Sequence, residues 1–486
     1  MEEKAKKDKM LNHSAIYAVG IFIQYSTSIV MMPIYTRYLT PQDYGVADLL
    51  ALGVEVVGLI IGVISAEAIF RFYFEKDDAQ HKRSVAFTVF LVSLLINLVG
   101  YLFIYFTAVY SSSYLFEGTN ISNGVALVRI YGATLIFQVL TAIPMAYIRA
   151  QQKPVLFVIF SVLRLVLAVA CNIYFIVYQE LHVVGVIYAV FTFSAIHGAI
   201  LFTYMISKTG ITFSGSLACK ALSFSWPLML SSFALFLVTY ADRLFIKHYI
   251  DLTAVGLYSL AYKFGFIFIA VSWAPFSQMW ESQRYIVVKQ ANAQEVFRYT
   301  FRMTQGFVLI CAAGLSIFAQ DILRILAGSE FQEAYRLIGL IVFAYVFNIW
   351  SQYCMFGILY SKKTIYKSYA DWLTLFFTLI LYFVLIPKWG AMGAAVATYI
   401  SLLSRFLLLN YWSNKFFDMS LDWPKTILIS ILAYLVYGIS IYIEAPIMIS
   451  LALNSSLLFG FMVMVWFIGF SIQDRERVTD YIKAFR

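Results

Sequence analysis

Residues 84–110, SVAFTVFLVSLLINLVGYLFIYFTAVY, contain no charged side chain and are long enough to cross a lipid bilayer as a helix. The whole chain has the same character, since 62% of its 486 residues are hydrophobic, 13% are charged and the mean hydropathy is +0.80. Soluble domains are about 45–50% apolar and about 25% charged. A water-soluble enzyme is therefore excluded, and the sequence predicts an all-α polytopic membrane protein.

Apolar runs between polar breaks predict about fourteen transmembrane helices. An even number of helices places both termini on one side of the membrane, and no connecting loop has room for a soluble catalytic domain. The predicted helices cover residues 12–35, 45–72, 84–110, 123–149, 155–178, 183–206, 223–249, 255–282, 300–318, 337–360, 368–386, 391–412, 426–443 and 447–471.

The basic residues support this topology. With the N-terminus in the cytoplasm, 25 of the 35 Lys and Arg residues are assigned to inner tails and loops, where Arg71, Arg149 and Arg302 are counted as helix-end residues. Five, including Lys247, are assigned to outer loops, and five lie inside spans. Inner loops of membrane proteins carry an excess of Lys and Arg. The net charge of +9 is thus explained by membrane orientation, and we expect no nucleic-acid partner.

Three sequence matches recur at nearly one offset. RYLTPQDYG at 37–45 and HYIDLTAVG at 248–256 are 211 residues apart, the Gln152-Lys153 and Lys362-Lys363 turns 210, and Gly185 and Gly393 208. An even number of helices per repeat predicts two parallel lobes related by a pseudo-two-fold axis. The predicted organisation is a cytoplasmic tail (1–11), an N-terminal six-helix lobe (12–210), a C-terminal six-helix lobe (211–415), helices 13 and 14 (416–471) and a cytoplasmic tail (472–486).

Five basic residues lie inside predicted spans, where a charge costs about 2.5–3.5 kcal/mol at the helix centre. We interpret them as a cationic cavity for an anionic substrate such as a phosphate or pyrophosphate headgroup. In the alternative interpretation, each base neutralises a neighbouring acid or reaches a lipid phosphate. Depth in the membrane favours substrate binding for Arg164 and Lys263, whereas the adjacent Asp242 favours an ion pair for Arg243. The other two bases are Arg129 and Arg405, for which both interpretations stay open.

Three further polar residues lie within spans. Glu55 is near the middle of the second span and has no partner in its own helix. It either pairs with a base on another helix or binds the H⁺ or Na⁺ that drives transport. Asp371, close to the inner end of span eleven, is expected at the membrane interface, and His197 is expected to be a buried, hydrogen-bonded histidine.

The chain carries no enzyme motif. A Gly-rich phosphate loop followed by Lys-Ser/Thr, HExxH and GxSxG are all missing. Of the four cysteines, three lie in apolar segments and Cys219 is placed in a loop, without CxxC spacing, which predicts neither disulfides nor a zinc site. We therefore expect no catalytic residue, no cofactor and no metal.

The stretch PIYTRYLTPQDYG at 33–45 resembles the opening signature of Wzx-type polysaccharide-unit flippases, a family of the multidrug/oligosaccharidyl-lipid/polysaccharide exporter superfamily. AIFRFY at 68–73, SWPL at 225–228, Asp242-Arg243 and GLYS at 256–259 resemble that family in the same order. The resemblance implies two lobes around a cavity that opens alternately to each side. It also implies a cargo of undecaprenyl-pyrophosphate-linked oligosaccharide, moved to the outer leaflet of the bacterial cytoplasmic membrane.

The resemblance further implies which residues face the cavity. Helices one, two, seven and eight typically line it, which favours Glu55, Arg243 and Lys263 over the other intramembrane bases. Coupling to an ion gradient is implied too, with Glu55 as the candidate carrier of H⁺ or Na⁺. Besides the lipid bilayer, the expected partners are a polysaccharide polymerase or chain-length machinery of O-antigen, capsule or exopolysaccharide synthesis.

Other functions stay open at this point. A lipid II flippase for peptidoglycan synthesis is hardly separated from the first interpretation. An ion-coupled multidrug exporter of the same superfamily would favour an acidic cavity, and the five intramembrane bases argue against it. A membrane-embedded glycan polymerase would need a large outer loop with catalytic residues, and a purely structural scaffold would leave the costly intramembrane charges without a purpose.

Overall fold

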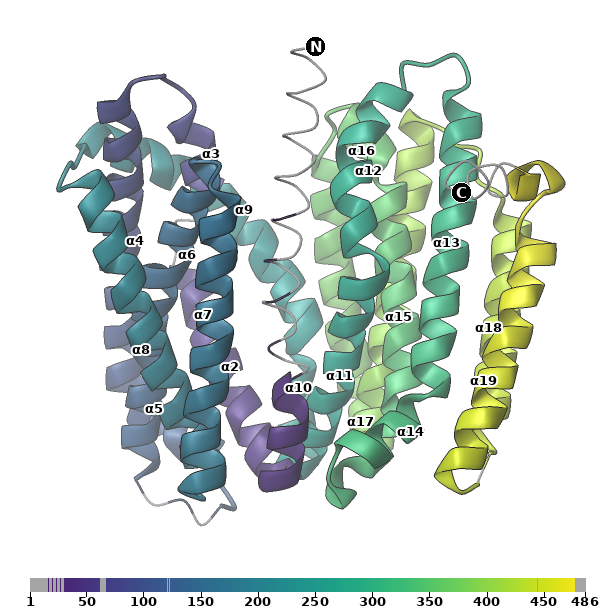
Figure 1. Ribbon diagram of the computed structural model, residues 1–486, viewed down its shortest axis with the longest axis horizontal. Helices are drawn as coiled ribbons and strands as arrows, with labels where there is room; N and C mark the ends of the chain where they lie inside the picture. Colours follow the sequence, from purple (N-terminus) through teal and green to yellow (C-terminus); the bar gives the residue numbers. More distant parts are fainter. Residues whose placement is uncertain are drawn as a thin grey trace. The chain divides into compact units, whose positions relative to one another are not determined.

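The computed structural model describes residues 16, 20, 23, 27, 30–61, 67–119, 121, 123–443 and 445–476, with their side chains except at 61, 67, 227, 228, 230–232, 235, 278 and 282. All regular secondary structure in this part of the chain is helical (Figure 1). The helices are α2 (Pro41–Ile61), α3 (Glu67–Tyr73), α4 (Ala79–Leu115), α5 (Gly124–Gly132), α6 (Thr134–Ala150), α7 (Pro154–Asn172), η1 (Ile173–Tyr178), α8 (His182–Thr209), α9 (Gly215–Tyr240), α10 (Asp242–Tyr249), α11 (Leu252–Ser272), α12 (Ala274–Val287), α13 (Ala293–Ile317), α14 (Ala319–Leu326), η2 (Ser329–Ala334), α15 (Tyr335–Cys354), α16 (Phe356–Tyr360), α17 (Ile365–Phe416), α18 (Trp423–Ile441), α19 (Ile447–Met464) and η3 (Val465–Gly469).

Ten helical segments of the described residues are long and apolar enough to cross a membrane, which confirms the all-α polytopic class. The first predicted span, 12–35, lies mostly outside the described residues. Predicted spans eleven and twelve both fall within α17, whose 52 residues would extend about 78 Å as one straight helix. Gly390 interrupts that helix with φ 59° and ψ −139°. The count of fourteen stays a prediction. Cys219 lies in α9, so its placement in a loop was wrong.

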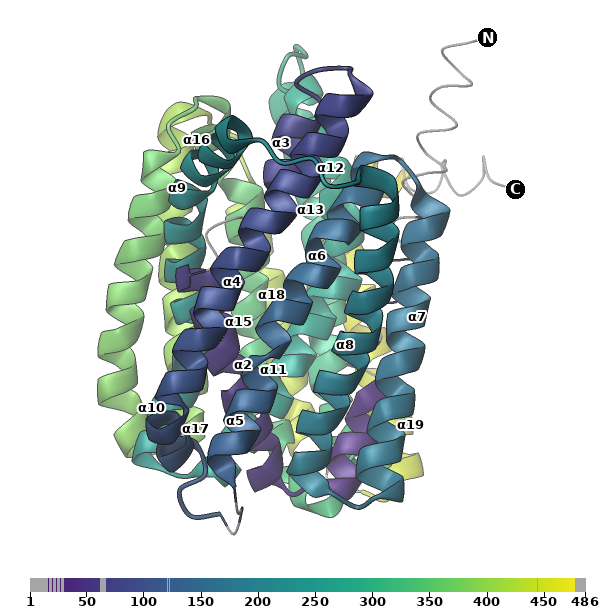
Figure 2. The ribbon, with the colours of Figure 1, turned by 90° about the vertical axis from the view of Figure 1, so that its left-hand side faces the viewer.

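The chain divides into two compact units between Leu244 and Phe245. This division lies within the predicted C-terminal lobe, and the predicted domain boundaries stay a prediction. In the N-terminal unit, α4, α6 and α8 lie side by side (Figures 1 and 2). In the C-terminal unit, α15 packs against α11, α13 and α17.

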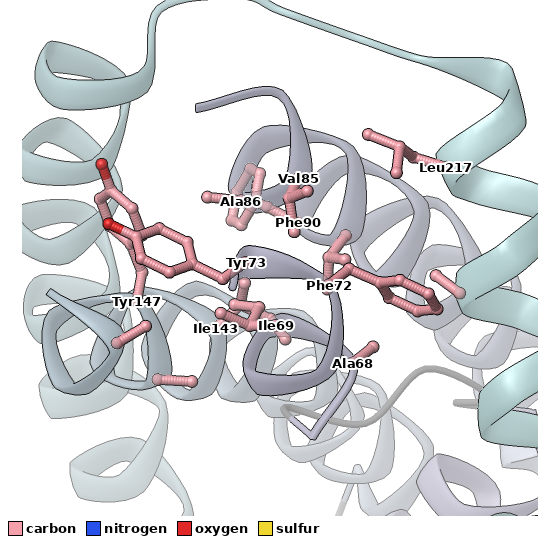
Figure 3. Packing of buried hydrophobic residues seen from close by; sticks show 14 of the residues in the cluster. Ala68, Ile69, Phe72, Tyr73, Val85, Ala86, Phe90, Ile143, Tyr147 and Leu217 are labelled. Carbon is pink, nitrogen blue, oxygen red and sulfur yellow. The ribbon is translucent and has the colours of Figure 1, made fainter. Parts of the chain in front are cut away.

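The short helix α3 is held by an apolar core of the N-terminal unit. Its residues Ala68 and Ile69 are fully buried among side chains of α4, α6 and α9 (Figure 3). Phe72 packs edge-to-face on Phe224 of α9, with ring centres 5.8 Å apart. The AIFRFY stretch of the flippase resemblance therefore acts mainly in packing, while its Arg71 is exposed.

The internal repeat is visible in two equivalent turns, one in each unit. Gln152 and Lys362 both have positive φ, 56° and 58°. In each turn this residue's N–H donates to the carbonyl oxygen three residues earlier, at 2.9 and 3.1 Å. The next N–H donates to the carbonyl five residues earlier, at 3.3 and 3.1 Å. Both helices thus end in the same Schellman motif, 210 residues apart.

Close backbone packing explains why glycine occurs at the equivalent positions 185 and 393. A Cβ added to Gly185 would lie 2.8 Å from the carbonyl oxygen of Phe175, and one added to Gly393 would lie 2.2 Å from that of Leu385. In each unit, the helix that begins near this glycine passes directly over the backbone of the preceding helix. Only glycine fits so close an approach without displacing the backbone.

We expect Gly393→Ala to lower the stability of the purified protein by about 1–3 kcal/mol, because the added methyl group forces backbone apart. Thermal unfolding in detergent measures the loss. Gly460→Ala is the matched control, since a Cβ there meets no atom within 4 Å. Equal unfolding temperatures for the two variants would contradict the close packing at Gly393.

Candidate functional site

Arg243 is buried in an ion-pair cluster at the start of α10. Its Nε donates to Oδ2 of Asp48 on α2 at 3.0 Å, and its Nη1 donates to Oδ1 of Asp242 at 2.8 Å. Nη1 also donates to the carbonyl oxygen of Thr239 at 2.9 Å. One cation faces two carboxylates here, so the ion-pair interpretation of Arg243 accounts for its charge. Its role in substrate binding stays a prediction.

Arg405 and Asp371 form a second buried cluster, in the C-terminal unit. Arg405 Nε donates to Asp371 Oδ1 at 2.8 Å, and its Nη1 donates to Oδ1 of Asn348 on α15 at 3.3 Å. Lys367 Nζ donates to the second oxygen of Asp371 at 3.0 Å. Asp371 is only 2% exposed, and its predicted place at the membrane interface stays a prediction. Its carboxylate lies inside the unit because it is the counterion of Arg405.

Two of the other predicted bases are half-buried and lie in different units. Arg129 on α5 donates from Nε to the backbone carbonyl oxygen of Tyr105 at 3.2 Å. Its guanidinium lies over the aromatic ring of Tyr105, 4.0 Å from the ring centre. This cation–π contact anchors Arg129 against α4. Lys263 lies on α11 of the C-terminal unit.

Arg164 lines a cavity of about 400 Å³ enclosed by α6, α7 and α8 in the N-terminal unit, here named the Arg164 cavity. Four phenylalanines contribute to its walls. Its other polar groups come from Gln138, Thr141, Arg149, Ser161, Ser194 and His197. Among the described residues that line it, none is an Asp or Glu. Arg164 is exposed to this space and forms no ion pair with a described residue. A guanidinium without a counterion attracts an anion.

His197 is a buried residue that lines the Arg164 cavity. Its Nε2 lies 3.1 Å from the carbonyl oxygen of Phe160, its Nδ1 lies 3.5 Å from Thr141 Oγ1, and it is 1% exposed. The expectation of a buried, hydrogen-bonded histidine is confirmed.

Glu55 lines a separate space of about 460 Å³ between α2, α4, α6 and α9, here named the Glu55 cavity. Asn97, Gln138 and Tyr240 contribute polar groups to it. Glu55 forms no ion pair within the described part of the chain, so the alternative of a direct base partner gains no support. Asp48 is among the charged groups that act on Glu55.

The two cavities share a wall in the middle of α6, because Gln138 and Ala142 line both. A carboxylate and a guanidinium of the N-terminal unit are therefore separated by one helix that carries an amide.

Sequence reasoning missed the two side chains that complete the buried clusters, Asp48 and Asn348. For Asp48 a signal existed, since it lies seven residues before Glu55 and therefore on the same face of α2. For Asn348 no signal existed, because its contact with Arg405 depends on how α15 and α17 cross.

Membrane-spanning helices, an internal repeat and charged side chains held inside helical units define a polytopic membrane protein. The chain belongs to the polysaccharide biosynthesis protein family, whose match covers residues 34–336. The resemblance of the Pro33–Gly45 signature to polysaccharide-unit flippases is confirmed at the level of the family.

Solved transporter structures share the fold. The lipid II flippase MurJ in an inward closed conformation aligns with a TM-score of 0.67 at 14% identity, over 93% of this chain and 99% of that one. An inward-facing multidrug resistance MATE family transporter of the MOP superfamily aligns with a TM-score of 0.61 at 14% identity, over 83% and 98%. A MATE in complex with MaL6 aligns with a TM-score of 0.55 at 15% identity, over 85% and 96%. No curated protein matches the sequence.

We expect Asp371→Ala to destabilise the protein by about 3–5 kcal/mol, because it leaves the buried Arg405 without a counterion. The double variant Asp371→Ala with Arg405→Met should recover much of this loss in a thermal unfolding assay. Glu333→Ala is the control, since Glu333 pairs with Arg336 at the surface, where both side chains are more than half exposed. A single variant as stable as the wild type would refute the counterion role.

Proposed function

We propose that the chain is a flippase that moves undecaprenyl-pyrophosphate-linked oligosaccharide across the bacterial cytoplasmic membrane by alternating access. Its product would supply a surface polysaccharide such as O-antigen, capsule or exopolysaccharide. The observation that carries the proposal is Arg164, a guanidinium inside a membrane unit that faces a cavity without a described acid. Membership of the polysaccharide biosynthesis family and the fold shared with a lipid II flippase support this class of cargo.

The physical argument concerns the diphosphate. An unshielded diphosphate cannot enter hydrocarbon, where even one charge on a helix costs about 2.5–3.5 kcal/mol by insertion scales. Fixed guanidinium and ammonium groups in a wet cavity replace its hydration shell, while the prenyl tail stays in the lipid. In the proposed topology both termini are cytoplasmic, as the excess of basic residues in the inner loops indicates.

The proposed driving force is an H⁺ or Na⁺ gradient that acts through Glu55. This carboxylate lines a polar cavity and forms no ion pair with a described residue. Binding of a cation there would change the charge that faces Asp48 and Arg243, the two charged groups that act on Glu55. An ion that binds one conformation better than another shifts the equilibrium between them.

Lipid II is the competing cargo, because its transport would use the same diphosphate chemistry and MurJ shares the fold. Complementation separates the two. Rescue of surface polysaccharide in a strain that lacks its repeat-unit flippase supports our proposal, whereas rescue of peptidoglycan synthesis in a strain depleted of its lipid II flippase supports the alternative.

We expect Arg164→Ala and Lys263→Ala to reduce surface polysaccharide to about a tenth of wild type or less, since a charged hydrogen bond contributes roughly 1.5–3 kcal/mol. Immunoblotting of membranes confirms that each variant is inserted. Arg336→Ala is the control, because that arginine is exposed and pairs with Glu333. Full polysaccharide levels in both variants would exclude a role of these charges in transport.

We expect Glu55→Gln to abolish the dependence of transport on the ion gradient, because the amide keeps the volume but binds neither H⁺ nor Na⁺ in exchange. Flipping of a fluorescent prenyl-diphosphate glycan in proteoliposomes, with and without an imposed pH or Na⁺ gradient, measures this dependence. Glu333→Gln changes an exposed carboxylate that pairs with Arg336 at the surface, so it is the control and should keep the gradient response. A Glu55→Gln protein that still follows the gradient would remove Glu55 from the coupling mechanism.

A further inference from the structure

The internal repeat places the Arg164 cavity and the Arg405 cluster at equivalent positions of the two units. The offset of 210 residues, fixed by the Gln152 and Lys362 turns, aligns α6 with the second half of α15 and α16, and α7 with the first half of α17. The offset of 208 residues, fixed by Gly185 and Gly393, aligns α8 with the second half of α17.

Three pairs of side chains then correspond. Gln138 corresponds to Asn348, Ser161 to Asp371, and His197 to Arg405. In the C-terminal unit, Asn348 and Asp371 both contact Arg405 directly. In the N-terminal unit, the three counterparts all line the Arg164 cavity. Since both triplets converge, the correspondence holds in space as well as in sequence.

The two positions differ in charge. The C-terminal unit supplies its own anion, Asp371, which binds Arg405 and Lys367. The N-terminal unit has Ser161 in that place, and Arg164 and Arg149 beside it on the cavity wall. The guanidinium of Arg149 lies over the rings of Phe70 and Phe157 at 5.1 and 5.8 Å. The cavity therefore has arginines at positions of its own, while His197 occupies the place of Arg405, and its described lining residues include no acid.

We propose that the Arg164 cavity binds the phosphate group of an amphipathic phosphate ester, which occupies the place of the missing carboxylate. Arginine presents a planar fork of donors that matches phosphate oxygens, and Ser194 and Gln138 are able to donate further hydrogen bonds. The Ser161 hydroxyl already donates to the carbonyl oxygen of Phe157 at 2.9 Å. The phenylalanine walls suit a hydrocarbon chain, which a free inorganic anion does not have.

Two sources offer this chemistry. One is the prenyl diphosphate of the cargo, a source that rests on the proposed function. The other is an anionic phospholipid of the surrounding bilayer, resident in the N-terminal unit, which is independent of the cargo. A site inside one unit differs from a cavity between two lobes because it does not require the second unit for binding.

The most direct test places in the N-terminal unit a carboxylate like the one that the C-terminal unit has. Ser161→Asp installs the acid that the repeat has at Asp371, three residues before Arg164 on the same helix face, where an ion pair forms readily. Ser161→Asn has the same size without the charge and is the matched control. Arg164→Gln removes the cation and is the second test of the site, to be used if Ser161→Asp does not fold.

Thermal unfolding of the purified full-length protein in neutral detergent, titrated with geranylgeranyl diphosphate or phosphatidylglycerol, measures binding. Phosphatidylcholine and inorganic pyrophosphate serve as comparison ligands. We expect a saturable rise in unfolding temperature for at least one of the two probes in the wild type and in Ser161→Asn. We expect an affinity weaker by about tenfold or more in Ser161→Asp and Arg164→Gln.

Each outcome decides between sources or overturns the site. A response to the prenyl diphosphate alone identifies the cargo, and a response to phosphatidylglycerol identifies a bilayer lipid. No response in the wild type, or equal responses of Ser161→Asp and Ser161→Asn, overturns the phosphate site. Failure of the flippase proposal is distinguishable, because surface polysaccharide would then be unchanged on deletion of the gene while the ligand titrations still hold.

Discussion

The need to compensate every charge inside the membrane organises this structure. Hydrocarbon provides no solvent for a guanidinium, so each buried arginine must meet a carboxylate, a carbonyl group or water. Arg243 meets Asp48 and Asp242, and Arg405 meets Asp371. These clusters tie the first turn of α10 to α2 in the N-terminal unit and tie the two halves of α17 to each other in the C-terminal unit.

The same constraint makes Arg164 a candidate binding residue. Its neighbours provide hydroxyl, amide and aromatic groups but, among the described residues, no negative charge. A charge inside a membrane unit without a fixed partner is typical of functional sites, where the partner is a substrate or an ion. The comparison with the C-terminal unit sharpens this point, because the equivalent position there is closed by an internal ion pair.

The two units therefore share one backbone arrangement but differ in the side chains that lie between its helices. Both units end their fourth repeat helix in the same Schellman turn, and both use a glycine to let the sixth helix cross the backbone of the fifth. With the backbone conserved between the units in this way, side-chain identity alone decides whether the space between these helices is filled. Asp371 and Arg405 fill it in one unit, and Ser161 and His197 leave it open in the other.

The sequence by itself determined the membrane class, the length of most helices and the offset of the repeat, because hydrophobic length, charge sidedness and turn glycines are local properties of the chain. It also predicted five intramembrane bases and Glu55 as candidate site residues. It could not decide which bases are already paired, since Asp371 reaches Arg405 and Asp48 reaches Arg243 only through the crossing of helices distant in sequence. The tertiary structure decided that Arg243 and Arg405 are compensated from within and that Arg164 faces a cavity. The physical reason is that a charge is stabilised by the groups within a few ångströms of it, and the folding of helices onto one another determines those groups.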